Sequence, residues 1–219
     1  MEELNNAMSF NSSPSGARGS GGGNIVIIKY NAGNIQSVLY ALERIGITAT
    51  VTANHEEILA ADKVIFPGVG EANSAMNSLK ENNLHQLIPT LTQPVLGICV
   101  GMQLLCKYSE ENNTECLGIF DEPVKLFKPN ADANLKVPKI GWNNIYDLQS
   151  PLMKGIDENS YCYFVHSYYV PLTKHTIATA NYVQPYSAAI HKNNFYGVQF
   201  HAEKSSIVGE QILRNFLKI

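Results

Sequence analysis

The sequence has 219 residues, of which 45% are hydrophobic and 16% are charged, and its formal net charge is -3 at pH 7. These values are typical of one globular α/β domain with a sizeable core, and the lack of a broad basic field argues against nucleic acid as a principal partner. No apolar stretch approaches the roughly 18 residues that cross a bilayer, and the N-terminus lacks the apolar run of a secretory signal. We therefore expect a cytoplasmic protein with no membrane partner.

Residues 1–23 are rich in Ser, Gly and Asn and contain no apolar periodicity. Such a segment cannot bury enough apolar surface to fold, so we expect a disordered tail or a linker added for expression. The folded domain is expected to span residues 24–219.

The first half of this domain alternates between strand and helix patterns. A β-branched run at Ile25–Ile28 predicts a strand buried on both faces, and apolar residues recur at helical spacing from Ile35 to Ile45. Further strands are predicted at 48–52, 63–66 and 95–98, and a short helix near 56–60. This alternation predicts parallel strands joined by right-handed crossovers.

The second half is predicted to contain shorter, antiparallel or mixed strands. They follow a predicted helix at 102–108 and precede a final helix at 206–217; the strands are expected at 124–127, 140–146, 161–170, 176–180, 187–191 and 196–200. The whole chain therefore predicts a three-layer α/β fold, with a mixed, largely parallel sheet and helices on both faces.

The segment Gly97-Ile98-Cys99-Val100-Gly101 has the form of a strand that turns sharply into a helix. Such a turn exposes a nucleophile, and glycines two residues before and after Cys99 permit close packing where a β-carbon would collide. The unpaired N–H groups of a helix beginning at Val100 would stabilise a thiolate or an oxyanion. The alternative for Cys99 is a buried core cysteine, the commoner position of a lone cysteine.

A second glycine-rich segment, Pro67-Gly68-Val69-Gly70, directly follows a predicted strand. Two glycines allow the backbone to approach a ligand and to aim peptide N–H groups at a substrate oxygen. The alternative is an ordinary strand-to-helix turn. Ligands of parallel α/β sheets bind beyond the carboxyl ends of the strands, where both this segment and Cys99 would lie.

His201 is the candidate base for Cys99, because it follows the predicted strand that ends at Phe200. Residues two apart in extended chain face the same side, so Glu203 can orient the imidazole of His201. A histidine can take the thiol proton near neutral pH and return it to a leaving amine. Taken singly, His201 could be a hydrogen-bonded edge residue and Glu203 a solvated carboxylate.

The remaining cysteines and histidines do not indicate a metal or a disulfide framework. Four cysteines, at 99, 106, 116 and 162, lack a Cys-x-x-Cys spacing, and no two histidines stand four apart beside an acid. We expect reduced thiols, no metal site and no cofactor.

Taken together, residues 97–103 and the segment Val198-Gln199-Phe200-His201-Ala202-Glu203-Lys204-Ser205 resemble the class I, triad-type glutamine amidotransferases. Segments 67–70, 140–143 and 165–169 resemble, within that class, the HisH glutaminase subunits of imidazole glycerol phosphate synthase. The resemblance runs from about Asn24 to the C-terminus. It implies the class I amidotransferase fold and hydrolysis of glutamine to glutamate through a cysteinyl thioester.

The resemblance also implies roles for particular residues. Cys99 would be the nucleophile, His201 the acid and base, and Glu203 its orienter. The positions that match the oxyanion hole are Gly68, Val69, Gly70 and Val100. Those that match the glutamine site are Gly68, Gln103, Glu111, His166 and Ser167, and those that match the partner interface are Trp142, Tyr163 and Lys204. Trp142 could equally be an ordinary core residue.

The implied partner is a HisF-type cyclase subunit with a (β/α)₈ barrel, which would form a heterodimer with this chain. The barrel would receive ammonia through an internal channel and convert PRFAR to imidazole glycerol phosphate and AICAR, in histidine biosynthesis. Two departures from the family pattern are Lys29-Tyr30-Asn31, where Asp-Tyr-Gly is frequent, and Ala202, where proline is usual. Losing proline leaves the orientation of Glu203 less secure.

Three other functions remain as alternatives. A different amidotransferase subunit, such as that of GMP or anthranilate synthesis, would share the triad and differ in the acceptor of ammonia. A scaffold protein could keep the fold without turnover, although Cys99, His201 and Glu203 are all present. A free-standing thiol hydrolase would have no need of the interface positions Trp142 and Lys204.

Overall fold

The computed structural model describes residues 23–31, 34–129 and 135–219 of the chain. The predicted tail lies almost entirely outside the described residues, so its boundary at residue 23 stays a prediction.

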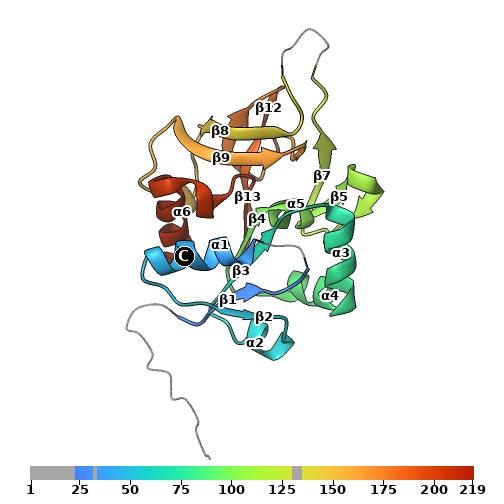
Figure 1. Ribbon diagram of the computed structural model, residues 1–219, viewed down its shortest axis with the longest axis vertical. Coiled ribbons are helices and arrows are strands. Elements are labelled where there is room, and N and C mark those ends of the chain that lie inside the picture. The colour runs from blue at the N-terminus through green and yellow to red at the C-terminus, as the bar shows by residue number, and fades with distance from the viewer. Residues whose placement is uncertain (1–22, 32–33, 130–134) are drawn as a thin grey trace, which may run out of the picture.

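A seven-stranded sheet forms the centre of the molecule (Figure 1). Its order is β11-β12-β13-β4-β3-β1-β2, and the strands span Ile25–Ile28 (β1), Thr50–Thr52 (β2), Lys63–Gly68 (β3), Val95–Cys99 (β4), Thr176–Asn181 (β11), Pro185–Lys192 (β12) and Phe195–Val198 (β13). The strands from β13 to β2 are parallel, whereas β12 and β11 continue the sheet antiparallel. The predicted mixed, largely parallel sheet is confirmed.

Helices cover both faces of this sheet, because each right-handed crossover places its helix according to the direction in which the chain moves along the sheet. In Figure 1, α1 (Ile35–Arg44) and α6 (Ser206–Lys218) lie side by side, and α3 (Ala72–Glu81) packs with α4 (Leu84–Leu87). The short helices α2 (His55–Leu59) and α5 (Val100–Leu104) complete the layers. Side chains of β1 and β4 are buried along the whole strand, as expected for strands covered on both faces.

Two parts of this region differ from the sequence prediction. The predicted helix at 102–108 is wrong, because α5 ends at Leu104 and Cys106–Ser109 forms a strand, β5. The apolar spacing of Met102 and Leu105 fits a helix, but pairing of β5 with two other strands decides the outcome. Helices α3 and α4 were not predicted, although Ala75, Met76 and Leu79 are buried at helical spacing.

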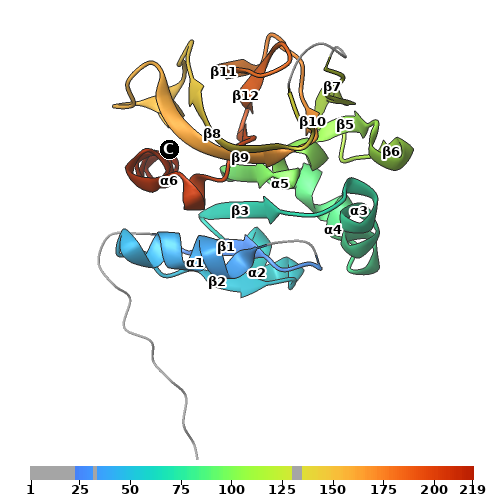
Figure 2. The same cartoon turned by 45° about the horizontal axis from the view of Figure 1, so that its top comes forward.

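Two smaller sheets lie beside the central one. A four-stranded sheet has the order β10-β7-β5-β6, with β6 at Thr114–Glu115, β7 at Phe120–Leu126 and β10 at Tyr168–Tyr169. The antiparallel hairpin of β8 (Lys139–Ile145) and β9 (Ser160–His166) contacts α6, and Figure 2 shows it curving over the molecule in yellow and orange. The predicted strand at 161–170 is therefore divided into β9 and β10 by Ser167.

Candidate active site

Cys99 occupies the sharp turn between β4 and α5. Its φ of 54° and ψ of −112° lie in a region that non-glycine residues rarely adopt, as is typical of a strained nucleophile turn. A β-carbon at Gly97 would meet the backbone of Gly101 at 2.9 Å, and one at Gly101 would overlap the carbonyl oxygen of Phe66. The expected reason for the two glycines is thus confirmed: the helix packs directly on its own strand and on β3.

His201 and Glu203 lie beside this turn. Nδ1 of His201 is 2.7 Å from Oε1 of Glu203, and the His201 ring lines the same cavity as Cys99. Burial alone lowers the His201 pKa, but hydrogen bonds and charges from Cys99 and Glu203 outweigh burial and raise it to about 10. All three side chains are nearly inaccessible, with residue exposures of 3% for Cys99, 4% for His201 and 6% for Glu203.

The turn that carries His201 is fixed by its own hydrogen bonds, with alanine where proline is usual. The His201 N–H donates to the Tyr163 carbonyl at 2.9 Å, and the Ser205 hydroxyl donates to the His201 carbonyl at 2.7 Å. The same hydroxyl accepts from the Tyr163 N–H at 2.9 Å. Gly209 of α6 adds close packing, because a β-carbon there would overlap the Ala202 carbonyl oxygen. Tertiary contacts therefore orient Glu203 where a fixed proline φ is missing.

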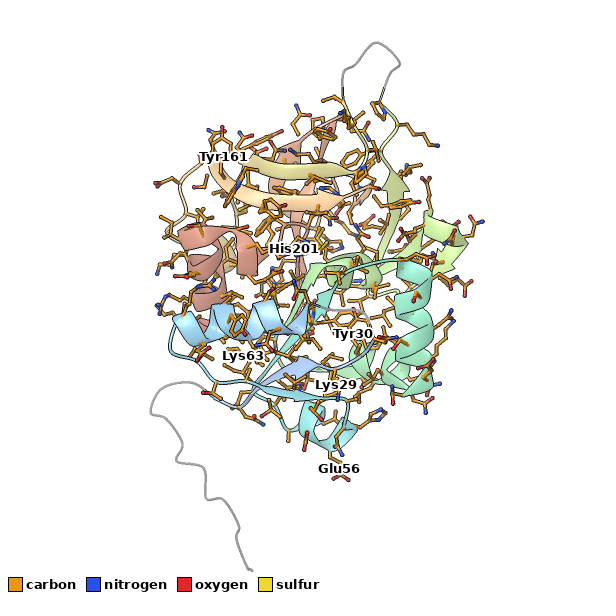
Figure 3. All side chains as sticks on the ribbon, in the orientation of Figure 1. Lys29, Tyr30, Glu56, Lys63, Tyr161 and His201 are labelled. Atoms are coloured by element: carbon orange, nitrogen blue, oxygen red, sulfur yellow. The ribbon has the colours of Figure 1, made fainter. Side chains whose placement is uncertain are left out.

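A cavity of about 310 Å³ opens at the three-residue arrangement of Cys99, His201 and Glu203. Cys99 and His201 line it, together with most residues predicted for the oxyanion hole and the glutamine site, namely Val69, Gly70, Val100, Gln103, Glu111, His166 and Ser167. Lys204 also lines it, as do Pro138, Val165 and Tyr168, which were not predicted. The fold thus brings predicted residues from five separate segments of the chain together around one cavity (His201 is labelled in Figure 3).

Four predicted residues lie outside the lining, and one of them is Glu203, which lies behind His201. Gly68 is the last residue of β3 and is buried against Gly101 of α5. Trp142 and Tyr163 lie on the β8–β9 hairpin, with ring centroids 5.8 Å apart in an edge-on arrangement. Trp142 is 50% exposed, so the alternative of an ordinary core residue is wrong.

Gln103 is held by two hydrogen bonds that leave its amide oxygen toward the cavity. Its Nε2 donates to the Tyr168 carbonyl at 3.0 Å and to Oε1 of Gln199 at 3.0 Å. Nε2 of Gln199 lies 3.8 Å from the Cys99 sulfur. Sequence reasoning missed Gln199, although a polar residue at the end of a buried strand was a usable signal. Because both Nε2 protons of Gln103 are used, its Oε1 is the atom left to accept from a ligand.

Glu111 and His166 form two further walls of the cavity. Oε2 of Glu111 accepts the N–H of Ala72 at 2.7 Å and so caps α3, while burial raises the Glu111 pKa. Nδ1 of His166 lies 2.7 Å from the Tyr168 carbonyl, and burial lowers the His166 pKa to about 4. His166 is therefore neutral near pH 7, which fits the non-catalytic role expected of it.

Within residues 23–31, 34–129 and 135–219, no three His, Cys, Asp or Glu side chains are grouped as ligands for a metal ion. Over the same part of the chain, no helix is long and apolar enough to cross a membrane.

A cysteine on a strained turn, with a histidine and a glutamate beside it at the ends of parallel strands, is the arrangement typical of a thiol amidase. The family model described as "Glutamine amidotransferase class-I" matches residues 26–219. The chain belongs to this family, as its motifs predicted.

Curated relatives place the chain more narrowly. It is 56% identical to the "Imidazole glycerol phosphate synthase subunit HisH" of Bacteroides fragilis, over 89% of this chain and 99% of the relative. It is 46% identical to the HisH subunit of Escherichia coli, over 90% of this chain and 100% of that one. The predicted subfamily is thereby confirmed.

Solved structures with much lower identity share the fold. One is a putative GMP synthase subunit from Thermoplasma acidophilum, with a TM-score of 0.68 and 18% identity over 90% of this chain and 93% of that one. Another is described as a glutamine amidotransferase, with a TM-score of 0.67 and 16% identity over 89% and 97% of the two chains. The predicted class I amidotransferase fold is confirmed.

Proposed function

We propose that the cavity binds glutamine and that this chain is the glutaminase subunit of an imidazole glycerol phosphate synthase. The observation that carries the proposal is the hydrogen-bonded pair His201 and Glu203 beside Cys99, which lies on a strained turn and lines the same cavity as His201. The identity with HisH subunits supports the particular synthase. This combination favours HisH over a subunit of GMP or anthranilate synthesis.

In the first half of the reaction, the Cys99 sulfur attacks the side-chain amide carbon of glutamine. His201 already carries the proton lost by the thiol and gives it to the departing nitrogen, so that ammonia leaves and a glutamyl thioester remains. The raised pKa of His201, about 10, means that it carries a proton at neutral pH and can act as that acid. Glu203 stabilises the imidazolium across the 2.7 Å hydrogen bond.

The oxyanion of each tetrahedral intermediate needs two donors. The N–H of Val100, at the start of α5, is one, and a peptide N–H within Gly68-Val69-Gly70 is the other. In the second half of the reaction, His201 takes a proton from water, the hydroxide attacks the thioester carbon, and the thiolate leaves with glutamate as the product.

Glutamine is an α-amino acid, so its site must pair an ammonium and a carboxylate. The Glu111 carboxylate and Oε1 of Gln103 are acceptors suited to the ammonium group. Backbone groups at His166 and Ser167 bind the carboxylate of glutamine, and Gly68 lies near its side-chain amide carbonyl. A neutral His166 can line the glutamine site without competing with His201 for the thiol proton.

The partner is a HisF-type (β/α)₈ cyclase that uses the ammonia to convert PRFAR into imidazole glycerol phosphate and AICAR. The relatives are named as subunits, which implies a second subunit. Trp142, Tyr163 and Lys204 form the proposed contact, and the exposure of Trp142 (50%) and of Ile140 (61%) on the same hairpin supports it. A channel is needed because ammonia released into neutral water becomes ammonium and loses its nucleophilic lone pair. Cytoplasmic location stays a prediction.

The test uses the chain reconstituted with its cyclase. Cys99→Ala is expected to abolish synthesis from glutamine and to leave synthesis from ammonium salts unchanged. Cys106→Ala is the matched control, because it removes another buried thiol close to α5. If Cys99→Ala retained glutamine-dependent synthesis, the mechanism would be overturned. If the wild-type pair showed no glutamine-dependent synthesis, the assignment as a subunit of imidazole glycerol phosphate synthase would be overturned.

A further inference from the structure

Tyr30 is a buried residue next to the site that the proposed mechanism does not use. It follows β1, is 7% exposed and is labelled in Figure 3. Its ring lies 5.4 Å from that of Phe66, between centroids, and its hydroxyl donates to the carbonyl oxygen of Pro67 at 2.7 Å. The tyrosine is thus joined to the last residues of β3.

This hydrogen bond replaces a missing backbone partner. The β1–β3 ladder ends at the pair Ile27 and Ile65, so β1 supplies no backbone donor as far along β3 as Pro67. The side chain of Tyr30 supplies that donor instead. Burial raises the Tyr30 pKa, with a further contribution from Cys99, so the hydroxyl stays protonated and continues to donate.

The carbonyl that Tyr30 holds belongs to the peptide immediately before the oxyanion segment. Gly68 is still paired with Cys99 in the β3–β4 register, and a β-carbon on it would lie 2.5 Å from the Gly101 nitrogen and 2.9 Å from the Tyr30 hydroxyl. Two residues later, Gly70 has a φ of +88° and open space around it. Packing therefore fixes the backbone as far as Gly68, whereas no such contact surrounds the α-carbon of Gly70.

We propose that Tyr30 is a positioning residue for the oxyanion hole, whose hydroxyl anchors the Pro67–Gly68 peptide beside Cys99. The inference rests on the proposed function. With this peptide anchored, any rotation that aims an N–H at the substrate oxygen is confined to the two peptides of Gly68-Val69-Gly70. Without the Tyr30 hydroxyl, the N–H donor of the oxyanion hole would occupy more positions. The transition state would then be stabilised less, whereas binding of glutamine in the ground state would change little.

The test is Tyr30→Phe in the reconstituted pair with a PRFAR analogue bound. We expect kcat for glutamine hydrolysis to fall about 10-fold or more, with KM for glutamine changed less than about 3-fold. Affinity for an aldehyde analogue of glutamine should fall by a similar factor, because the Cys99 thiol adds to its carbonyl to give a tetrahedral hemithioacetal. Alkylation of Cys99 by iodoacetamide should keep its rate, since alkylation needs no oxyanion hole.

Tyr196→Phe is the control, because it removes a tyrosine hydroxyl from a buried position in β13 outside the cavity lining. It should leave kcat unchanged. An unchanged kcat in Tyr30→Phe overturns the inference, and so does a joint change of kcat, KM and alkylation rate, which would indicate general loosening. Synthesis from glutamine by the wild-type pair is measured in parallel. Its failure would count against the proposed function, whereas its success assigns the outcomes above to Tyr30 alone.

Discussion

Oε1 of Glu203 accepts a hydrogen bond from Nδ1 of His201 at 2.7 Å, while Oε2 of the same buried carboxylate has no hydrogen-bond partner within the described parts of the chain. The negative charge of Glu203 is therefore directed at the imidazole. A carboxylate so placed favours the imidazolium form and fixes which ring nitrogen faces Cys99.

Replacing this carboxylate should impair chemistry more than binding. Glu203→Gln is expected to lower kcat for glutamine hydrolysis in the liganded pair by roughly 10²-fold or more, with a small change in KM, because an amide neither stabilises imidazolium nor selects the tautomer. Steady-state kinetics give both values. Glu210→Gln is the control, since Glu210 pairs with Arg44 at the surface; an equal loss in both variants would contradict the orienting role.

The raised pKa of His201 predicts how stability varies with pH. Its folded pKa of about 10 lies above the ordinary value of 6.5. The stabilisation from its bound proton is therefore complete below about pH 6.5 and is lost as pH rises through 10. Urea unfolding of the free chain should show an unfolding free energy that decreases across this window by more than it does in His201→Asn. Identical pH profiles for the two proteins would show that His201 contributes nothing.

The freedom of the oxyanion segment can be tested at Gly70. Its φ of +88° disfavours alanine, yet a β-carbon there meets nothing, so Gly70→Ala changes conformational preference alone. We expect glutaminase activity to be low in the free chain, to rise strongly with the liganded cyclase, and to rise much less in Gly70→Ala.

The control for Gly70→Ala is Gly46→Ala, whose φ of +79° and open surroundings impose a similar strain at the end of α1. Both variants should lose about 1 kcal/mol of unfolding free energy, and Gly46→Ala should keep normal activation. Full activation of Gly70→Ala would exclude a rearrangement of this loop.

The β8–β9 hairpin carries the predicted partner contact. Trp142→Ala should weaken binding to the cyclase about 10-fold or more, measured by titration calorimetry, because a half-exposed tryptophan is a typical interface anchor. Stability of the free chain should change little. Leu59→Ala, at a residue 54% exposed on α2, is the matched control. Equal affinities for all three proteins would place the interface elsewhere.

Several elements followed from local sequence alone. The buried β-branched run at Ile25–Ile28 and the Cys99 turn flanked by Gly97 and Gly101 obey short-range rules of chain direction and steric room, and the structure contains both. The pair His201 and Glu203 also follows from local spacing, because two residues on one short turn can meet without help from distant chain.

Other features depended on contacts between distant segments. Helical spacing around Met102 continued past Leu104, but pairing of β5 with β6 and β7 ended the helix. The roles of Gln199 at the Cys99 sulfur and of Tyr30 at Pro67 join residues 100 and 37 positions apart in sequence. The residue pattern within one segment cannot predict such contact partners, because the order of the strands in the sheet and the burial of each side chain determine them.

Residue types at short spacing were enough to predict the nucleophile, its base and the family, and of these the family is confirmed. Tertiary structure decided which groups surround them: Ser205 and Gly209 hold the catalytic turn that lacks proline, and Gln103 keeps only its oxygen for a ligand. The physical reason is that a hydrogen bond or a close packing contact exists only after the sheet has brought both partners together.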